Sequence, residues 1–140
     1  FINDLMHGVR KGATGVGIRA IALTDNIPMV TAVANDECYD NTFLRQVEIL
    51  FRPCDTLLLI SASGNSENLV RAANVAREAG GRVISFVGFD GGKLREMSHV
   101  AVRVPTERGE YGPVEDVHVM LVHIITMWLS EHAQGLPSGE

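Results

Sequence analysis

The sequence lacks the features that mark several common classes of protein. Its two cysteines, Cys38 and Cys54, do not have the spacing of a metal site, so we expect reduced thiols. No apolar run approaches the roughly 20 residues of a membrane span, and we expect no secretory signal. Positive charge does not prevail either: the net charge is -5, which gives no general attraction to nucleic acid or acidic membranes. We therefore expect a cytoplasmic protein without nucleic-acid or membrane partners.

The composition is that of one globular domain. The chain has 140 residues, of which 46% are hydrophobic and 21% are charged. This length is enough to bury a core, and this balance is typical of a folded rather than a disordered chain.

The most informative stretch is a strand, a turn and a helix between residues 55 and 79. Residues 56–60 are a short apolar run of the kind that is buried in a parallel sheet. Residues 61–66, S-A-S-G-N-S, contain no bulky side chain. Ser66 is a good N-cap and Glu67 places an acid in the first helical turn, so a helix is predicted to begin here.

This turn suggests a binding site for an anion. A helix N-terminus leaves backbone N–H groups unpaired and carries partial positive charge. Small residues let a phosphate approach those donors, and serine hydroxyls add further donors. The alternative is an ordinary strand-to-helix turn with serine caps, and local physics leaves both interpretations open.

The rest of the chain alternates strands with helices. Further strands are predicted over 18–23, 83–87 and 100–104, and helices over 1–10, 42–51 and 114–131. This order predicts an α/β fold, a three-layer α/β/α sandwich with a mostly parallel, doubly wound sheet. Ligands of such sheets bind beyond the carboxyl ends of the strands. The turn at 61–66 and the glycine-rich loop at 88–93 both follow a strand in this way.

The last predicted helix holds the densest set of titratable side chains: Glu115, Asp116, His118 and His123. Glu115 and His123 lie two turns apart along one side of the helix, at roughly 80°. Such a set is either a metal or acid/base site, or a helix start rich in acids with half-buried histidines. The residues alone favour the second interpretation.

The turn at 61–66 resembles the phosphosugar-binding turn of SIS (sugar isomerase) domains. Four further blocks, at 20–25, 34–36, 87–93 and 114–123, look like those of bacterial phosphoheptose isomerases in order and spacing. The resemblance runs from Phe1 to about residue 132. It implies one SIS domain over 1–133, followed by a flexible tail at 134–140. The family's first helix, first strand and glycine-rich loop would precede Phe1.

The resemblance also implies the roles of individual residues. The substrate and its phosphate would be bound by Ser61, Ser63, Asn65, Ser66 and Asp36. Glu115 and His123 stand where the family has two zinc ligands, a glutamine and a histidine. Asp4 stands where the family has a catalytic glutamate. Asp4 is therefore the implied base and His123 its partner, with zinc held by Asp4, Glu115, His123 and a histidine that would precede Phe1.

The implied function is the isomerisation of a sugar phosphate, such as sedoheptulose 7-phosphate, through an enediol by a homotetramer. The alternative is a non-catalytic phosphosugar-binding module that acts as a sensor or a protein-binding adaptor. The two departures from the family pattern, Asp4 and Glu115, keep this alternative open. A dinucleotide-binding enzyme is not expected, because the turn lacks the G-x-G-x-x-G spacing.

Overall fold

The computed structural model describes residues 1–11, 15 and 17–132. Its residues form two compact units, one of Leu23–Asp116 and the other of Phe1–Ala22 together with Val117–Glu140.

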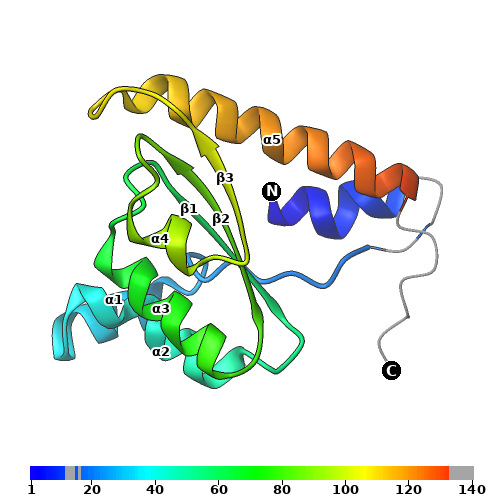
Figure 1. Cartoon of the computed structure of the whole chain (residues 1–140). Coiled ribbons are helices and arrows are strands. Elements are labelled where there is room, and N and C mark those ends of the chain that lie inside the picture. Colours follow the sequence, from blue (N-terminus) through cyan, green and yellow to red (C-terminus); the bar gives the residue numbers. More distant parts are fainter. Residues whose placement is uncertain (12–14, 16, 133–140) are drawn as a thin grey trace. The chain divides into compact units, whose positions relative to one another are not determined.

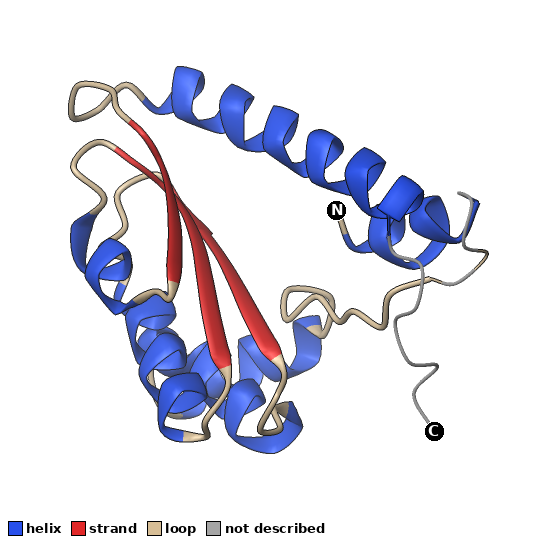
Figure 2. Ribbon diagram, turned by 45° about the vertical axis from the view of Figure 1, so that its right-hand side comes forward, coloured by secondary structure: helices blue, strands red, loops and turns tan. Residues whose placement is uncertain are grey.

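The larger unit is built on a three-stranded parallel sheet. The strands β1 (Thr56–Ser61), β2 (Arg82–Gly88) and β3 (Val100–Val104) pair in the order β1-β2-β3. Both pairs are parallel, with Thr56 opposite Arg82 and Ile84 opposite Val100. Figure 2 shows the three strands running in the same direction. The strands predicted over 56–60, 83–87 and 100–104 are therefore confirmed to within one residue at each end.

Helices come before, between and after these strands in the chain (Figure 1). They are α1 (Ile27–Asp36), the 3₁₀ turn η3 (Tyr39–Asn41), α2 (Thr42–Leu50), α3 (Glu67–Glu78), α4 (Gly92–Met97) and the start of α5 (Tyr111–His132). The helix α5 begins three residues before the predicted start, with Pro113 in its first turn. Proline is tolerated there because first-turn N–H groups have no partner within the helix.

One face of the sheet forms the core with α2, α3 and α4. The strand residues Leu57, Leu59, Val83 and Val87 are buried in a cluster with Val47, Val70 and Leu94. Three alanines of α3 in this cluster, Ala72, Ala73 and Ala76, have no exposed surface. Their small side chains let the helix lie close to its neighbours, and each buried valine or leucine contributes roughly 1.5–3 kcal/mol.

The opposite face of the sheet is covered at its carboxyl end by the first turns of α5. A Cβ atom added to Gly88 would lie 2.7 Å from both methyl carbons of Val114, whose side chain is fully buried. Gly88 and Val87 alternate along β2, so Val114 lies on the face opposite to the α3 side. Helices therefore contact both faces of a parallel sheet, and the predicted α/β class is confirmed.

The strand predicted over residues 18–23 is wrong. Residues 18–23 do not pair with any strand that the structure describes, although the N–H of Ile18 donates to the carbonyl of Leu5 at 3.0 Å. The carbonyl of Leu23 accepts from the side chain of Gln46, at 2.9 Å from Nε2. An apolar pattern shows that a segment can be buried, but a strand also needs a neighbouring strand to exchange hydrogen bonds with.

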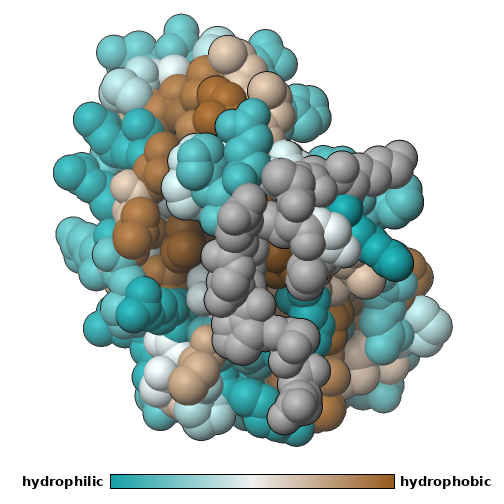
Figure 3. Space-filling model, turned by 90° about the vertical axis from the view of Figure 1, so that its right-hand side faces the viewer, coloured by the Kyte–Doolittle hydropathy of each residue, from teal (hydrophilic) through white to brown (hydrophobic). Residues whose placement is uncertain are grey.

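The smaller unit contains the N-terminal helical segment and most of α5. The predicted helix over 1–10 is confirmed as helical, with a π-helical part, η1 (Asp4–Gly8), and a 3₁₀ part, η2 (Val9–Lys11). Several large apolar side chains of α5 are exposed: Val119, Met120, Ile124, Met127 and Trp128. Figure 3 shows apolar side chains, in brown, among hydrophilic ones on one face of the molecule. None of the helices in the described part of the chain is long and apolar enough to cross a membrane.

Candidate active site

The serine-rich turn connects β1 to α3 at the carboxyl edge of the sheet. Ser61 ends β1, and its Oγ accepts the N–H of Gly64 at 3.1 Å. The same oxygen lies 3.4 Å from Oγ of Ser66. Ser63 Oγ accepts the N–H of Asn65 at 3.3 Å. The three hydroxyl groups thus belong to one compact turn, which local hydrogen bonds hold in shape.

The helix start beside this turn offers unpaired donors. Ser66 is the N-cap of α3 with extended backbone angles, as predicted, but its hydroxyl makes no capping hydrogen bond. Within the described part of the chain, the N–H groups of Ser66, Glu67 and Asn68 have no acceptor. These donors and the positive end of the helix dipole make the turn suitable for a bound anion.

A second loop braces the turn. It runs from Gly88, the last residue of β2, into the start of α4, and the Gly88 N–H donates to the carbonyl of Ala62 at 2.8 Å. The N–H of Leu94 donates to the carbonyl of Gly64 at 3.0 Å. Gly64 has φ +64°, and a Cβ atom there would collide with the carbonyl of Gly91. The two loops thus touch through their backbones, which explains why glycine stands on both sides of this contact.

The side chain of Asn65 joins the two loops. Its Oδ1 accepts the N–H of Lys93 at 3.1 Å, and its Nδ2 donates to the carbonyl of Ser63 at 2.9 Å. The family resemblance implies that Asn65 binds the substrate or its phosphate, and that role stays a prediction. The structure shows a different use of the amide, which holds the turn against the neighbouring loop. The three glycines in five positions at 88–92 indicate a tight loop, but they do not specify which segment this loop approaches.

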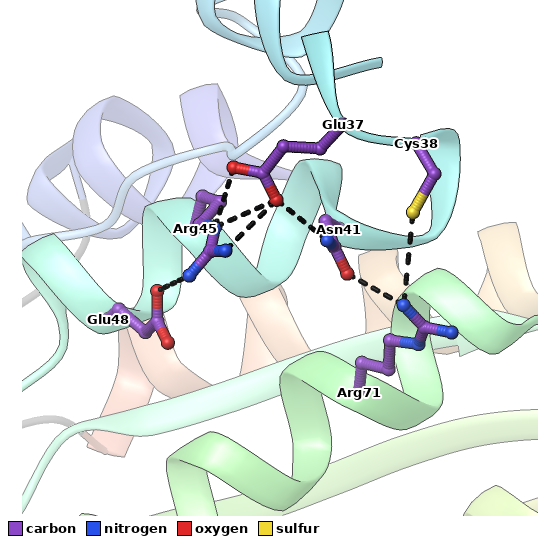
Figure 4. A network of polar contacts seen from close by, with 6 residues as sticks. All are labelled: Glu37, Cys38, Asn41, Arg45, Glu48 and Arg71. Carbon is purple, nitrogen blue, oxygen red and sulfur yellow. Dashed lines mark hydrogen bonds and ion pairs between the residues drawn. The ribbon is translucent and has the colours of Figure 1, made fainter.

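Arg71 anchors α3 to the segment that follows Asp36 (Figure 4). Arg71 Nη1 donates to Asn41 Oδ1 at 2.7 Å, and it lies 3.8 Å from the sulfur of Cys38. The segment has its own ion pair, between Arg45 and Glu37 at 2.9 Å. The hydrogen bond from Arg45, followed by that from Asn41, lowers the pKa of Glu37.

Asp36 itself is the last residue of α1 and its side chain is exposed. The segment that follows it is a short connection and the 3₁₀ turn η3. A role for Asp36 in contacting sugar hydroxyls stays a prediction.

The titratable residues of α5 differ in their environments. Glu115 and Asp116 are exposed in the first turns, as is His123 further along. His118 is 4% exposed and has an interaction partner, so it is a satisfied buried histidine. Of His118 and His123, only His123 is accessible to a ligand.

In the smaller unit, the segment of Asp4 packs against the segment of His123. A Cβ atom on Gly8 would lie 3.6 Å from Asp4 Cβ and 3.6 Å from Thr126 Cγ2. Thr126 lies one turn after His123 on α5, so the side of the N-terminal helix that carries Asp4 faces this part of α5. The Asp4 carboxylate lies 3.6 Å from the amino group of Phe1. The described residues contain no group of three His, Cys, Asp or Glu side chains that could hold a metal ion.

Comparison with known proteins agrees with this arrangement of a parallel sheet and a serine-rich turn. A family model described as SIS domain matches residues 8–88. The chain belongs to the SIS domain family. Phosphoheptose isomerase from Helicobacter pylori (strain P12) is 36% identical over 116 residues, which are 83% of this chain and 59% of that protein. Phosphoheptose isomerase from Mycobacterium tuberculosis (strain ATCC 25177 / H37Ra) is 42% identical over 115 residues, 82% of this chain and 56% of that protein.

Solved structures show the same relationship at the level of the SIS fold. The phosphoheptose isomerase of Neisseria gonorrhoeae matches with a TM-score of 0.80 and 33% identity, over 91% of this chain and 66% of that one. The phosphoheptose isomerase of Francisella tularensis matches with a TM-score of 0.77 and 31% identity, over 82% of this chain and 61% of that one. This SIS domain chain therefore spans less than two thirds of the length of these phosphoheptose isomerases.

Proposed function

We propose that this chain is an aldose–ketose isomerase that acts on a sugar phosphate of the sedoheptulose 7-phosphate type. The observation that carries the proposal is the serine-rich turn at the start of α3, where three backbone N–H groups have no acceptor in the described part of the chain. Phosphoheptose isomerases of several bacteria are similar to the chain over more than four fifths of its length.

The turn would anchor the phosphate of the substrate. Ser61 and Ser66 share one side of the turn, where their hydroxyls lie 3.4 Å apart, and Ser63 stands between them in the sequence. Hydroxyl and backbone donors bind phosphate oxygens, and fixing this end of the sugar positions its reacting carbons. Asp36, and the free hydrogen of the Asn65 amide, would add contacts to the sugar or its phosphate.

The isomerisation itself is proton transfer. A base removes the proton from the carbon beside the carbonyl, and the carbonyl oxygen receives a proton, which gives an enediol. Returning a proton to the other carbon, with loss of the hydroxyl proton, completes the conversion of ketose to aldose. We assign the base to Asp4 and the oxygen-directed acid to His123, because the smaller unit brings their segments together.

Zinc belongs to the same proposal. Carboxylate and imidazole groups such as those of Asp4, Glu115 and His123 are suitable zinc ligands, and zinc polarises a carbonyl. The described residues alone do not gather three such groups, and we assign the proton transfers to protein groups only. Metal analysis of the purified protein tests this part directly.

We also propose a cytoplasmic homotetramer. The exposed apolar side chains of α5, Met120, Ile124, Met127 and Trp128 among them, recur at helical spacing and form a stripe. Such a stripe on a helix is usually buried against another chain. Light scattering of the purified protein measures the number of subunits.

A non-catalytic phosphosugar-binding module is the second candidate. The observation that favours it is the pair of departures from the family pattern, Asp4 and Glu115. Aspartate is shorter than glutamate by one bond, which moves a base by roughly 1.5 Å. A displacement of this size is enough to reduce proton transfer strongly while leaving phosphate binding intact.

The test is an assay of the full chain with sedoheptulose 7-phosphate, with and without zinc, following the aldose phosphate. The isomerase is supported if turnover is lost in Asp4→Asn and His123→Ala but kept in the control His7→Ala, which changes an exposed histidine of η1. Binding without turnover, weakened by Ser61→Ala and Ser66→Ala, would instead establish the binding module. Activity that survives His123→Ala would contradict its assignment.

A further inference from the structure

Lys93 is held beside the phosphate turn by its own backbone. Its N–H donates to Asn65 Oδ1 at 3.1 Å, and Asn65 in turn donates to the carbonyl of Ser63 at 2.9 Å. The preceding residue, Gly92, has φ +53°, and a Cβ atom there would lie 2.5 Å from Asn65 Nδ2 and from the carbonyl oxygen of Ser63. The start of the Lys93 side chain is therefore fixed against the turn.

The other end of this side chain reaches the start of α3. Lys93 Nζ lies 3.5 Å from Glu67 Oε2, and Glu67 is the first residue of that helix. The Lys93 side chain thus extends from the turn to the helix N-terminus, which is where the unpaired N–H groups are. The side chain is 61% exposed, so no packing prevents its ammonium group from leaving Glu67.

Among the residues that the structure describes, no other cation near the turn is as available. The turn contains no basic residue. Arg71 is engaged by Asn41 at 2.7 Å and by Glu67 at 3.4 Å. The neighbouring arginines donate to backbone carbonyls, Arg95 to that of Asp90 and Arg103 to that of Phe89. In the described part of the chain, Lys93 makes one ion pair, with Glu67, and its backbone N–H donates to Asn65. Both of these partners belong to the proposed site.

We propose that Lys93 is a phosphate-binding residue whose ammonium group exchanges the Glu67 carboxylate for the phosphate of the sugar. This inference rests on the proposed function and adds a residue to its site. A phosphate dianion at the start of α3 would meet the negative charge of Glu67. Transfer of Lys93 to the phosphate places a compensating cation where the dianion binds, and it favours dianionic ligands over neutral sugars.

The experiment compares three variants of the full chain with the wild-type protein. Lys93→Met removes the cation, Lys93→Arg keeps it, and Arg82→Met removes a charge from the opposite edge of the sheet, where β2 begins. The dissociation constant of inorganic phosphate is measured by calorimetry, and the kinetics are measured with sedoheptulose 7-phosphate. We expect Lys93→Met to weaken phosphate binding about tenfold and to raise KM rather than lower kcat. Lys93→Arg and Arg82→Met should stay near wild type.

A fourth variant should change the affinity for phosphate in the opposite direction. Glu67→Gln removes the competing carboxylate, so phosphate should bind more tightly than to the wild type. If Lys93→Met binds phosphate as tightly as the wild type while Ser61→Ala binds it more weakly, the inference about Lys93 is overturned and the phosphate site stands. If the wild type binds neither inorganic phosphate nor the sugar phosphate, the proposed function fails and the inference fails with it.

Discussion

Gly64 and Gly91 lie so close together that the carbonyl group of Gly91 occupies the space a side chain on residue 64 would need. Gly64 belongs to the serine-rich turn after β1, and Gly91 to the loop after β2. Their contact makes the two loops one structural unit. The shape of the proposed phosphate site therefore depends on residues almost thirty positions away from it in the sequence.

The first prediction follows from this contact. Gly64→Ala should destabilise the protein by at least about 3 kcal/mol, because the left-handed backbone is strained and the loop of Gly91 must move. Gly80→Ala is the matched control: Gly80 also has a positive φ, +79°, but a Cβ atom there meets nothing within 4 Å. This control should cost only about 1–2 kcal/mol. Urea unfolding measures both, and equal losses would show that the contact contributes nothing.

The second prediction concerns Cys54, a non-glycine residue with φ +83° in the turn before β1. Cys54→Gly should raise the free energy of unfolding by about 0.5–1 kcal/mol, because relief of the left-handed strain exceeds the entropy that glycine loses on folding. Cys54→Ser keeps the strain and removes the thiol, so it should not stabilise. Thermal unfolding under reducing conditions compares them, and an equal gain in both variants would refute the backbone explanation.

A third prediction concerns His99, which holds the start of β2. Its imidazole Nδ1 accepts the backbone N–H of Val83 at 3.0 Å. The backbone N–H of His99 donates to the carbonyl of Val83 at 2.8 Å. Val83 is fully buried, so His99→Ala should leave a buried donor unsatisfied and cost about 1–3 kcal/mol. His99→Asn places an amide oxygen near the position of Nδ1 and should recover part of this loss. If His99→Ala loses no stability, or if His99→Asn recovers none of the loss, the hydrogen bond is not stabilising.

The fourth prediction is a dependence on pH. Hydrogen bonds from Arg45 and then Asn41 lower the pKa of Glu37, so this carboxylate stabilises the fold at neutral pH. Because its folded pKa lies below its unfolded pKa, this contribution is lost as the pH falls through the folded value. We expect an NMR titration to place Glu37 below an ordinary glutamate, and Arg45→Met to raise its pKa.

Glu37→Gln should flatten the acid side of the stability curve. Glu48→Gln is the matched control, because Glu48 pairs with the same arginine, Arg45, at 2.9 Å. If Arg45→Met left the titration of Glu37 unchanged, the ion pair would not be its cause.

The sequence determined the parts of this protein that are encoded locally. The apolar runs at 56–60, 83–87 and 100–104 predicted three strands, and S-A-S-G-N-S followed by Glu67 predicted where α3 begins. The periodicity of apolar residues, the capping residues and the small turn residues act over a few positions, so they can be recognised without knowledge of the fold.

Only the tertiary structure decided which distant groups meet. Residues 18–23 have the pattern of a strand, yet they form none, because a strand requires a partner that its own pattern does not specify. The same holds for Asn65 and Lys93, and for His99 and Val83: each residue is unremarkable in the sequence, and each hydrogen bond exists because parallel strands bring their ends together. The residues of the serine-rich turn were predictable, whereas the contact with the neighbouring loop and the position of Lys93 beside the turn were not.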